Sequence, residues 1–314
     1  MTKLLDLLEM KILSILHPKK CWNKPIRLQI ETTNYCNLNC KMCLRNFFKI
    51  KRFGFLSYDN FLKIAKQFPR VRHIELYGLG ESFLHKDIFK MISYFKNKDV
   101  KITTNGLPIN KNMAEKIVNS NLTQINFSVD ANEELYKQSR RSVLFNKLKE
   151  NISYLVNLRN NNNSKLIISI SIVALETNKQ YLKDFVNLAS ELNVDHATIQ
   201  EVNSLWYGKS VNVEKEVSET LKYSKENNVK LNYVRNPVKG KKICPEPFFG
   251  TYITWEGYVT PCCMLPSSDQ INFGNVLEKS FKKIWNNLKY QKFRRKISRG
   301  VPEVCRGCPL IRRE

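Results

Sequence analysis

The sequence predicts an α/β protein: a partial (β/α)6 barrel of the TIM-like kind, followed by a small cysteine-rich C-terminal domain. Two observations predict this fold. Between residues 26 and 202, six β-rich segments alternate with five helical patterns, which is typical of βαβ units and a parallel sheet. Five of the nine cysteines follow residue 243. Because six strands are too few to close an eight-stranded barrel, we expect the barrel to be open.

The expected elements follow in order along the chain. The expected strands cover residues 26–33, 73–78, 100–105, 123–130, 165–173 and 196–202. The expected helices, with apolar residues at steps of three and four, cover residues 58–68, 86–98, 110–120, 144–160 and 178–192. The C-terminal part predicts a linker (237–247), a hairpin that turns at Glu256–Gly257, and one helix (276–298). The predicted units are an N-terminal amphipathic helix (1–22), the barrel (23–240) and the C-terminal domain (241–314).

The N-terminal segment carries apolar residues at helical spacing. They are Leu4, Leu5, Leu8, Ile12, Ile15 and Leu16. Charged residues interrupt this stripe, so it does not have the pattern of a secretion signal. We expect the stripe to pack on the body of the protein, with attachment to a membrane surface as the alternative. No run of eighteen apolar residues occurs, and a transmembrane segment is not expected.

The chain is strongly basic, with 52 basic and 28 acidic residues and a formal net charge of +24. Such an excess attracts polyanions. The Lys and Arg residues are scattered, however, and aromatic residues do not alternate with them in a stacking pattern, which disfavours nucleic acid as a partner. An anionic small molecule or an acidic peptide stays open. The odd number of cysteines, without a secretion signal, indicates metal ligation in a reducing cytoplasm rather than disulfides.

Three cysteines, Cys36, Cys40 and Cys43, lie within eight residues directly after the first expected strand. Ligands bind at the carboxyl ends of the strands in parallel α/β folds. Thiolates select zinc, copper(I) or iron–sulfur clusters, and these three have no fourth cysteine nearby. On these residues alone, structural zinc stays an alternative.

Glycine and polar residues follow the next three strands at the same rim. They are Gly78, Gly80, Glu81, Thr104, Asn105, Ser128 and Asp130. The glycines would let a ligand approach the backbone, and Glu81 can accept hydrogen bonds from an ammonium group. The hydroxyl of Ser128 and the carboxylate of Asp130 suit a ribose. Turn chemistry explains each motif singly, but four strand ends together predict a ligand site.

With this combination the sequence resembles the radical S-adenosylmethionine (radical SAM) enzymes, over roughly residues 26–205. The resemblance implies that the three cysteines bind three irons of a [4Fe–4S] cluster, whose fourth iron binds the amino and carboxylate groups of SAM. It places Met42 near the adenine and Glu81, with its two glycines, at the methionine ammonium; here Leu79 separates glycines that are more often adjacent. The implied chemistry is reductive cleavage of SAM to a 5′-deoxyadenosyl radical, which takes a hydrogen atom from the substrate.

The C-terminal cysteines, with Gly274–Asn275 and the segment around Trp285, resemble the SPASM/twitch extensions of the same family. The resemblance implies an auxiliary [4Fe–4S] cluster on Cys244, Cys262, Cys305 and Cys308. Cys263 is ambiguous, since it could take the place of Cys262. Because the sequence ends six residues after the last CxxC, one auxiliary cluster is expected rather than two. A four-cysteine zinc ribbon is the alternative.

The expected function is therefore that of a cytoplasmic radical SAM oxidoreductase whose auxiliary cluster takes or passes an electron. Its substrate would be a small molecule, such as a sugar or alcohol, or a peptide. An external low-potential electron donor, such as flavodoxin or ferredoxin, is implied. The alternatives are an RNA-modifying radical SAM enzyme and a non-catalytic iron–sulfur or zinc protein. The sequence identifies no catalytic acid or base, although Ser169, Ser171, Gln200 and Glu201 could face the substrate.

Overall fold

The computed structural model describes residues 8–9, 11–13, 15–202, 207–208, 211–234 and 244–308. These residues form one nine-stranded sheet with the order β7-β6-β5-β4-β3-β2-β1-β8-β9. The strands are β1 (Arg27–Ile30), β2 (His73–Glu75), β3 (Asp99–Thr104), β4 (Gln124–Ser128), β5 (Ile167–Ala174), β6 (His196–Glu201), β7 (Leu231–Val234), β8 (Gly250–Ile253) and β9 (Val259–Thr260). All neighbouring strands are parallel except β8 and β9.

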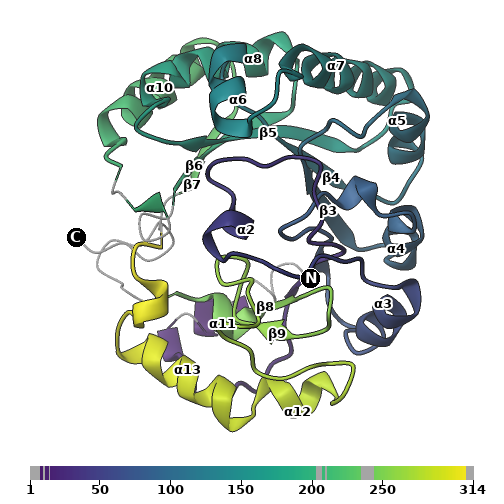
Figure 1. Ribbon diagram of the computed structural model, residues 1–314, viewed down its shortest axis with the longest axis vertical. Helices are drawn as coiled ribbons and strands as arrows, with labels where there is room; N and C mark the ends of the chain where they lie inside the picture. The colour runs from purple at the N-terminus through teal and green to yellow at the C-terminus, as the bar shows by residue number, and fades with distance from the viewer. Residues whose placement is uncertain are drawn as a thin grey trace.

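The sheet curls into an open ring, with the helices on its outside and the segment around α2 within its mouth (Figure 1). The barrel helices are α2 (Leu44–Phe47), α3 (Tyr58–Ala65), α4 (Ile88–Tyr94), α5 (Lys111–Val118), α6 (Glu133–Arg140), α7 (Phe145–Asn161), α8 (Leu182–Glu191) and α10 (Glu214–Glu226). The C-terminal helices are α11 (Glu246–Phe249), α12 (Phe281–Trp285) and α13 (Leu288–Arg299). Within the described ranges the edge strands β7 and β9 do not pair, which confirms the partial barrel.

The core lies between the sheet and its helices. Ile168, Ile170 and Ile172 of β5 are completely buried, as are Val100 and Ile102 of β3. Such apolar strands are typical of parallel sheets, because both faces are covered. These buried residues therefore lie within the β-rich segments expected from the sequence.

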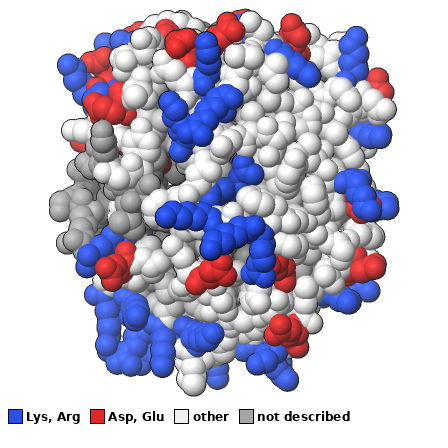
Figure 2. Space-filling model, in the orientation of Figure 1, with Lys and Arg blue, Asp and Glu red and all other residues white. Residues whose placement is uncertain are grey.

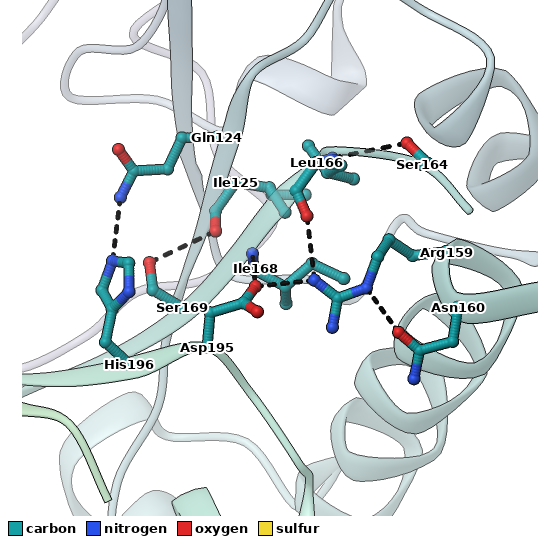
Figure 3. Close-up of polar contacts among 10 residues, drawn as sticks. All are labelled: Gln124, Ile125, Arg159, Asn160, Ser164, Leu166, Ile168, Ser169, Asp195 and His196. Atoms are coloured by element: carbon teal, nitrogen blue, oxygen red, sulfur yellow. Dashed lines mark hydrogen bonds and ion pairs between the residues drawn. The ribbon is translucent and has the colours of Figure 1, made fainter. Parts of the chain in front are cut away.

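The amino ends of the central strands are joined by a polar network (Figure 3). Arg159 Nη1 of α7 donates to the carbonyl of Leu166 (3.0 Å) and to Asp195 Oδ2 (2.7 Å), which also accepts from Ile168 N (2.6 Å). This ion pair ties α7 to β5 and to the start of β6. The network lies at the amino ends of these strands, away from the rim on which ligand binding is expected.

Each of the six expected strands is present, but the sheet extends further at both edges. β7 pairs with β6, and β8 pairs in parallel with β1, in the register Arg27 to Gly250. The C-terminal domain thus continues the barrel sheet. Its hairpin forms as expected: β8 and β9 pair antiparallel, and Gly257 has the positive φ (+89°) that the turn requires.

The single helix expected over residues 276–298 is wrong, since the structure has two helices, α12 and α13. Asn286 is the C-cap of α12 and Asn287 is the N-cap of α13. The side chain of Asn287 accepts a hydrogen bond from Tyr290 N (2.9 Å). The side chain of Asn286 bonds both the N–H and the carbonyl of Cys21. Asparagine competes with the helix for backbone hydrogen bonds, which explains the break.

The expected packing of the N-terminal stripe is also wrong for the described residues. Leu8, Ile12, Ile15 and Leu16 are 38–61% exposed, whereas Leu13, outside the stripe, is fully buried. The helix is turned so that Leu13 meets the core and the stripe faces outward. Leu4, Leu5 and the linker segment 237–243 lie outside the described residues. None of the helices that the structure describes is long and apolar enough to span a membrane.

Candidate functional site

The three N-terminal cysteines lie in the loop between β1 and α2, at the carboxyl end of β1. Asn34 holds this loop: its Nδ2 donates to the carbonyl of Arg52 (2.7 Å), and its Oδ1 accepts from Gly54 N (2.9 Å). The guanidinium of Arg45 also donates to the carbonyl of Leu38. All three thiols remain partly exposed, so the loop is ordered by its own contacts while its sulfurs stay accessible.

Two polar side chains point at the sulfurs of this loop. Asn105 Nδ2 donates to Cys36 Sγ (3.6 Å) and to Asn37 Oδ1 (2.8 Å). Burial raises the pKa of Cys36 to about 11, and burial also raises the pKa of Cys40, against which the Arg140 guanidinium acts. Iron displaces such thiol protons on binding, and hydrogen bonds to the sulfurs then tune the cluster potential. Asn105 thus donates hydrogen bonds to two residues of the cysteine loop, Cys36 and Asn37.

Glu81 is buried in the loop that follows β2 and is held by the end of β3. Its Oε1 accepts from Thr104 Oγ1 (2.8 Å) and Phe83 N (3.1 Å), and its Oε2 accepts from Asn105 N (2.7 Å). Burial raises the pKa of Glu81. A carboxylate offers about four acceptor sites, so three bonds fix its orientation and leave room for one further donor.

The two glycines before Glu81 accommodate the protein's own chain. A Cβ at Gly80 would lie 2.4 Å from the carbonyl oxygens of Thr33 and Tyr35, and one at Gly78 would lie 2.4 Å from the Glu31 side chain. The loops are joined there by Gly80 N to Thr33 O (3.1 Å) and Glu81 N to Tyr35 O (2.8 Å). The close approach expected of a ligand is therefore made by the segment that leads to Cys36.

Asp130 forms a buried ion pair that the sequence did not predict. Its Oδ2 accepts from Arg140 Nε (2.9 Å) and Ser139 Oγ (2.6 Å), and Arg140 in turn hydrogen-bonds the Cys40 thiol. The Asp130 carboxylate is completely buried, and its Oδ1 has no partner among the described residues. Arg140 lies ten residues after Asp130, at the end of α6. The helical pattern of Glu133–Arg140 is the sequence signal from which this pair could have been predicted.

A cavity of about 440 Å³ opens beside the cysteine loop. Residues that line it include Met42, Cys43, Phe47, Gln200, Glu201 and Met264. Ser169 and Ser171 do not line this cavity; both hydrogen-bond the side chain of Asn126 in the interior. Ser128, at the end of β4, is partly buried. The cavity thus joins the N-terminal cysteines, β6 and a residue that follows the C-terminal Cys262.

The C-terminal cysteines form a second group. Cys244, Cys305 and Cys308 are buried, and Cys262 is partly buried. Burial raises the pKa of Cys244 well above its ordinary value, and the charges of Cys305 and Cys308 add to this shift. Cys262 interacts electrostatically with Cys244 and Cys308. Electrostatic interactions thus link Cys244 with Cys262, Cys305 and Cys308.

Cys263 faces a different environment. Burial raises its pKa to about 12, against the charge of Arg27, which ion-pairs with Glu75 and Glu246. Like Cys262, Cys263 also interacts electrostatically with Cys308, so Cys263 lies between the ion-pair cluster of Arg27 and the auxiliary cysteines.

Two family models match these two parts of the chain. That of the radical SAM superfamily matches residues 30–189, about half of the sequence, and that of the SPASM iron–sulfur cluster-binding domain matches residues 244–309. The chain is a radical SAM enzyme.

Several known proteins align with most of the length of this radical SAM enzyme. The tungsten-containing aldehyde ferredoxin oxidoreductase cofactor-modifying protein of Pyrococcus furiosus is 26% identical over 90% of this chain and 87% of its own. The probable GTP 3′,8-cyclase of Methanocaldococcus jannaschii is 27% identical over 76% of this chain and 84% of its own. SuiB of Streptococcus suis bound to S-adenosylmethionine superposes with a TM-score of 0.71 at 17% identity, over 86% of this chain and 68% of SuiB. The last similarity shows the fold.

The cofactors of the enzyme are thus SAM and [4Fe–4S] clusters, including an auxiliary cluster. The residues present fit them. Three partly exposed thiols lie beside a cavity, and two of them receive donors, Cys36 from Asn105 and Cys40 from Arg140. The unpartnered Asp130 Oδ1 is an acceptor at the same rim. Among the residues described, no three His, Cys, Asp or Glu side chains are grouped as a single-ion metal site.

Proposed function

We propose that this radical SAM enzyme is an oxidoreductase that abstracts a hydrogen atom from a substrate held in the 440 Å³ cavity. The observation that carries the proposal is that Met42 and Cys43 line the same cavity as Gln200 and Glu201 of β6. When bound, the [4Fe–4S] cluster and SAM supply a 5′-deoxyadenosyl radical. The enclosing strands keep water away from this reactive species.

Each rim residue has a proposed task. Cys36, Cys40 and Cys43 hold the cluster, and Glu81 offers its remaining acceptor site to the SAM ammonium. Thr104 and Asn105 fix Glu81, as their hydrogen bonds to its two oxygens support. Asp130 orients Arg140 through the buried ion pair, and Arg140 donates to the sulfur of Cys40. Met42 and Ser128 are proposed for the adenosine part of SAM.

The auxiliary site is proposed to pass an electron rather than bind substrate. Four cysteines, Cys244, Cys262, Cys305 and Cys308, would fill all four iron positions of one cluster and leave none for a ligand. All nine cysteines are free thiols, which supports a reducing compartment such as the cytoplasm.

For the substrate we propose a small polar molecule. The cavity volume falls in the range of about 300–1,000 Å³ that small-molecule sites have. The two relatives that match most of the chain are named for modifying a cofactor and for cyclising GTP. A peptide is the second candidate, because SuiB has been solved with its precursor peptide SuiA at a TM-score of 0.70.

Anaerobic reconstitution tests the proposal. The protein should hold about eight irons per chain, four from each cluster, and form 5′-deoxyadenosine from SAM with dithionite. Cys40→Ala should abolish that product, and Cys244→Ala should lower the iron content to about four. Cys21→Ala is the matched control, because this buried cysteine lies in neither group and should leave both values unchanged. No 5′-deoxyadenosine from a fully loaded parent would refute the proposal.

A further inference from the structure

A second hollow, of about 710 Å³, lies between α6, the segment that follows it, and Lys41 of the cysteine loop. We name it the α6 groove; the residues that matter here are Lys41, Glu134, Lys137, Arg141, Val143 and Leu144. Lys41 lines both this groove and the 440 Å³ cavity. The groove is therefore separated from the proposed cluster site by a single stretch of chain.

The wall of the groove is joined directly to the cluster loop. The N–H of Lys41, next to Cys40, donates to the carbonyl of Ser139 (2.8 Å) at the end of α6. Arg140 hydrogen-bonds Cys40 from the inside, and Arg141, the following residue, lines the groove. A partner seated in the groove would thus come close to the cysteine sulfurs, and electron tunnelling requires such proximity.

The groove carries an excess of positive charge. Lys41, Lys137 and Arg141 are exposed, and no ion pair is recorded for them among the described residues. Glu134 is the acidic member of the groove, and its Oε1 accepts a hydrogen bond from Gln138. In Figure 2 blue side chains gather over α6 and over the segment around α2 in the mouth of the ring.

The floor beside these charges is apolar. Val143 is 67% exposed and Leu144 is 42% exposed. Exposed apolar side chains rimmed by like charges are typical of surfaces that bind another protein. The charges steer an oppositely charged partner and the apolar residues bind it.

We propose that the α6 groove is the docking site of a small acidic electron-carrier protein. This rests on the proposed function, because the electron delivered here would go to a reducible cluster at Cys36, Cys40 and Cys43. One electron would pass from the reduced carrier, which is oxidised by one electron, to the cluster that Cys36, Cys40 and Cys43 would hold, which is reduced by one. No bond forms or breaks in this step.

The test uses flavodoxin as the probe and two pairs of charge reversals. Lys137→Glu with Arg141→Glu reverses two charges spaced four residues apart in the groove. Lys292→Glu with Lys296→Glu is the matched control, with the same spacing on the exposed face of α13, at the opposite end of the molecule (Figure 1). The full-length reconstituted protein is used throughout, and its iron content checks that each variant is intact.

The groove variant should bind oxidised flavodoxin at least about tenfold more weakly at low ionic strength and lose most of the salt dependence of Kd. With reduced flavodoxin as donor, 5′-deoxyadenosine formation should fall by a similar factor, and with dithionite it should match the parent. A Lys137→Gln, Arg141→Gln variant should lie between the two. The α13 control should resemble the parent in every assay.

Three results would overturn the docking site. They are unchanged flavodoxin binding by the groove variant, an equal loss with dithionite, or a loss confined to the α13 control. A parent that forms no 5′-deoxyadenosine even with dithionite would instead refute the proposed function.

Discussion

Gly80→Ala should break the contact between the cysteine loop and the loop of Glu81. The new Cβ would lie 2.4 Å from the carbonyl oxygens of Thr33 and Tyr35, whereas C···O contacts are normally about 3.3 Å or longer. The loops must therefore separate by about 1 Å, which stretches Gly80 N to Thr33 O (3.1 Å) beyond hydrogen-bond range. The companion bond, Glu81 N to Tyr35 O (2.8 Å), is strained in the same way.

Leaving a buried backbone group unpaired costs about 1–3 kcal/mol, so two broken bonds lower the free energy of unfolding by about 2–6 kcal/mol. At about 2–4 °C per kcal/mol, the melting temperature of the apo-protein should fall by roughly 4–24 °C. Iron content after reconstitution should fall as well, because Cys36 follows Tyr35. Leu79→Ala is the control: it adds no atom at the contact and retains the Leu79 N–H bond to Glu31. A Gly80→Ala protein that melts and loads iron like the parent would show that the loops are not packed in this way.

Three further outcomes are expected. Asp130→Asn should cost about 3–5 kcal/mol in urea unfolding, because it leaves the Arg140 charge buried and unpaired; a loss below 1 kcal/mol would contradict the ion pair. Burial raises the pKa of Glu31, so the folded state binds its proton more tightly, and the resulting stability is greatest at low pH and is lost as the pH rises through the raised pKa. In Glu31→Gln, the fall in apo-protein melting temperature as the pH rises above the ordinary glutamate pKa of 4.5 should therefore be shallower than in the parent. Arg294 is fully buried between the rings of Trp285 and Tyr290 (4.1 Å to each) and donates to the carbonyls of Pro247 and Trp285. Arg294→Leu leaves those two carbonyls without a donor, at a cost of about 1–3 kcal/mol each. Iron analysis after mild heating should therefore show an iron content that falls toward about four per chain.

The strands and long helices could be predicted from local periodicity because burial on two covered faces dictates their apolar residues. β7 was not predicted because it lacks two covered faces: this edge strand is only four residues long, and its residues alternate between half-buried and exposed. The break at Asn286–Asn287 was also beyond periodicity. It depends on side-chain hydrogen bonds to the backbone, one of them to Cys21, 265 residues away.

The candidate site, too, could be predicted only in part from the sequence. The type of ligand could be predicted from the spacing, because thiols separated by three and by two residues must share one loop. The roles of the other rim residues depended on partners distant in the chain. The requirement for Gly80 comes from carbonyl groups of the β1 loop, and Asp130 faces Arg140, which no strand-end pattern reveals.

The separation between the two cysteine groups is set by strand pairing. At its amino end β1 carries Arg27, which interacts with Cys263 and Glu246 beside the auxiliary cysteines. Directly after its carboxyl end comes Glu31, which accepts from Tyr252 OH (2.9 Å) and Trp255 N (3.2 Å) of the C-terminal domain. Because β1 is four residues long, these two anchor points lie about 13 Å apart at about 3.3 Å per residue. Since β8 runs parallel to β1 between the same two points, the C-terminal domain cannot shift along the barrel without breaking this ladder. In the proposed function, an electron that passes from the cavity to the auxiliary site would therefore cross a distance fixed by the hydrogen bonds of the sheet.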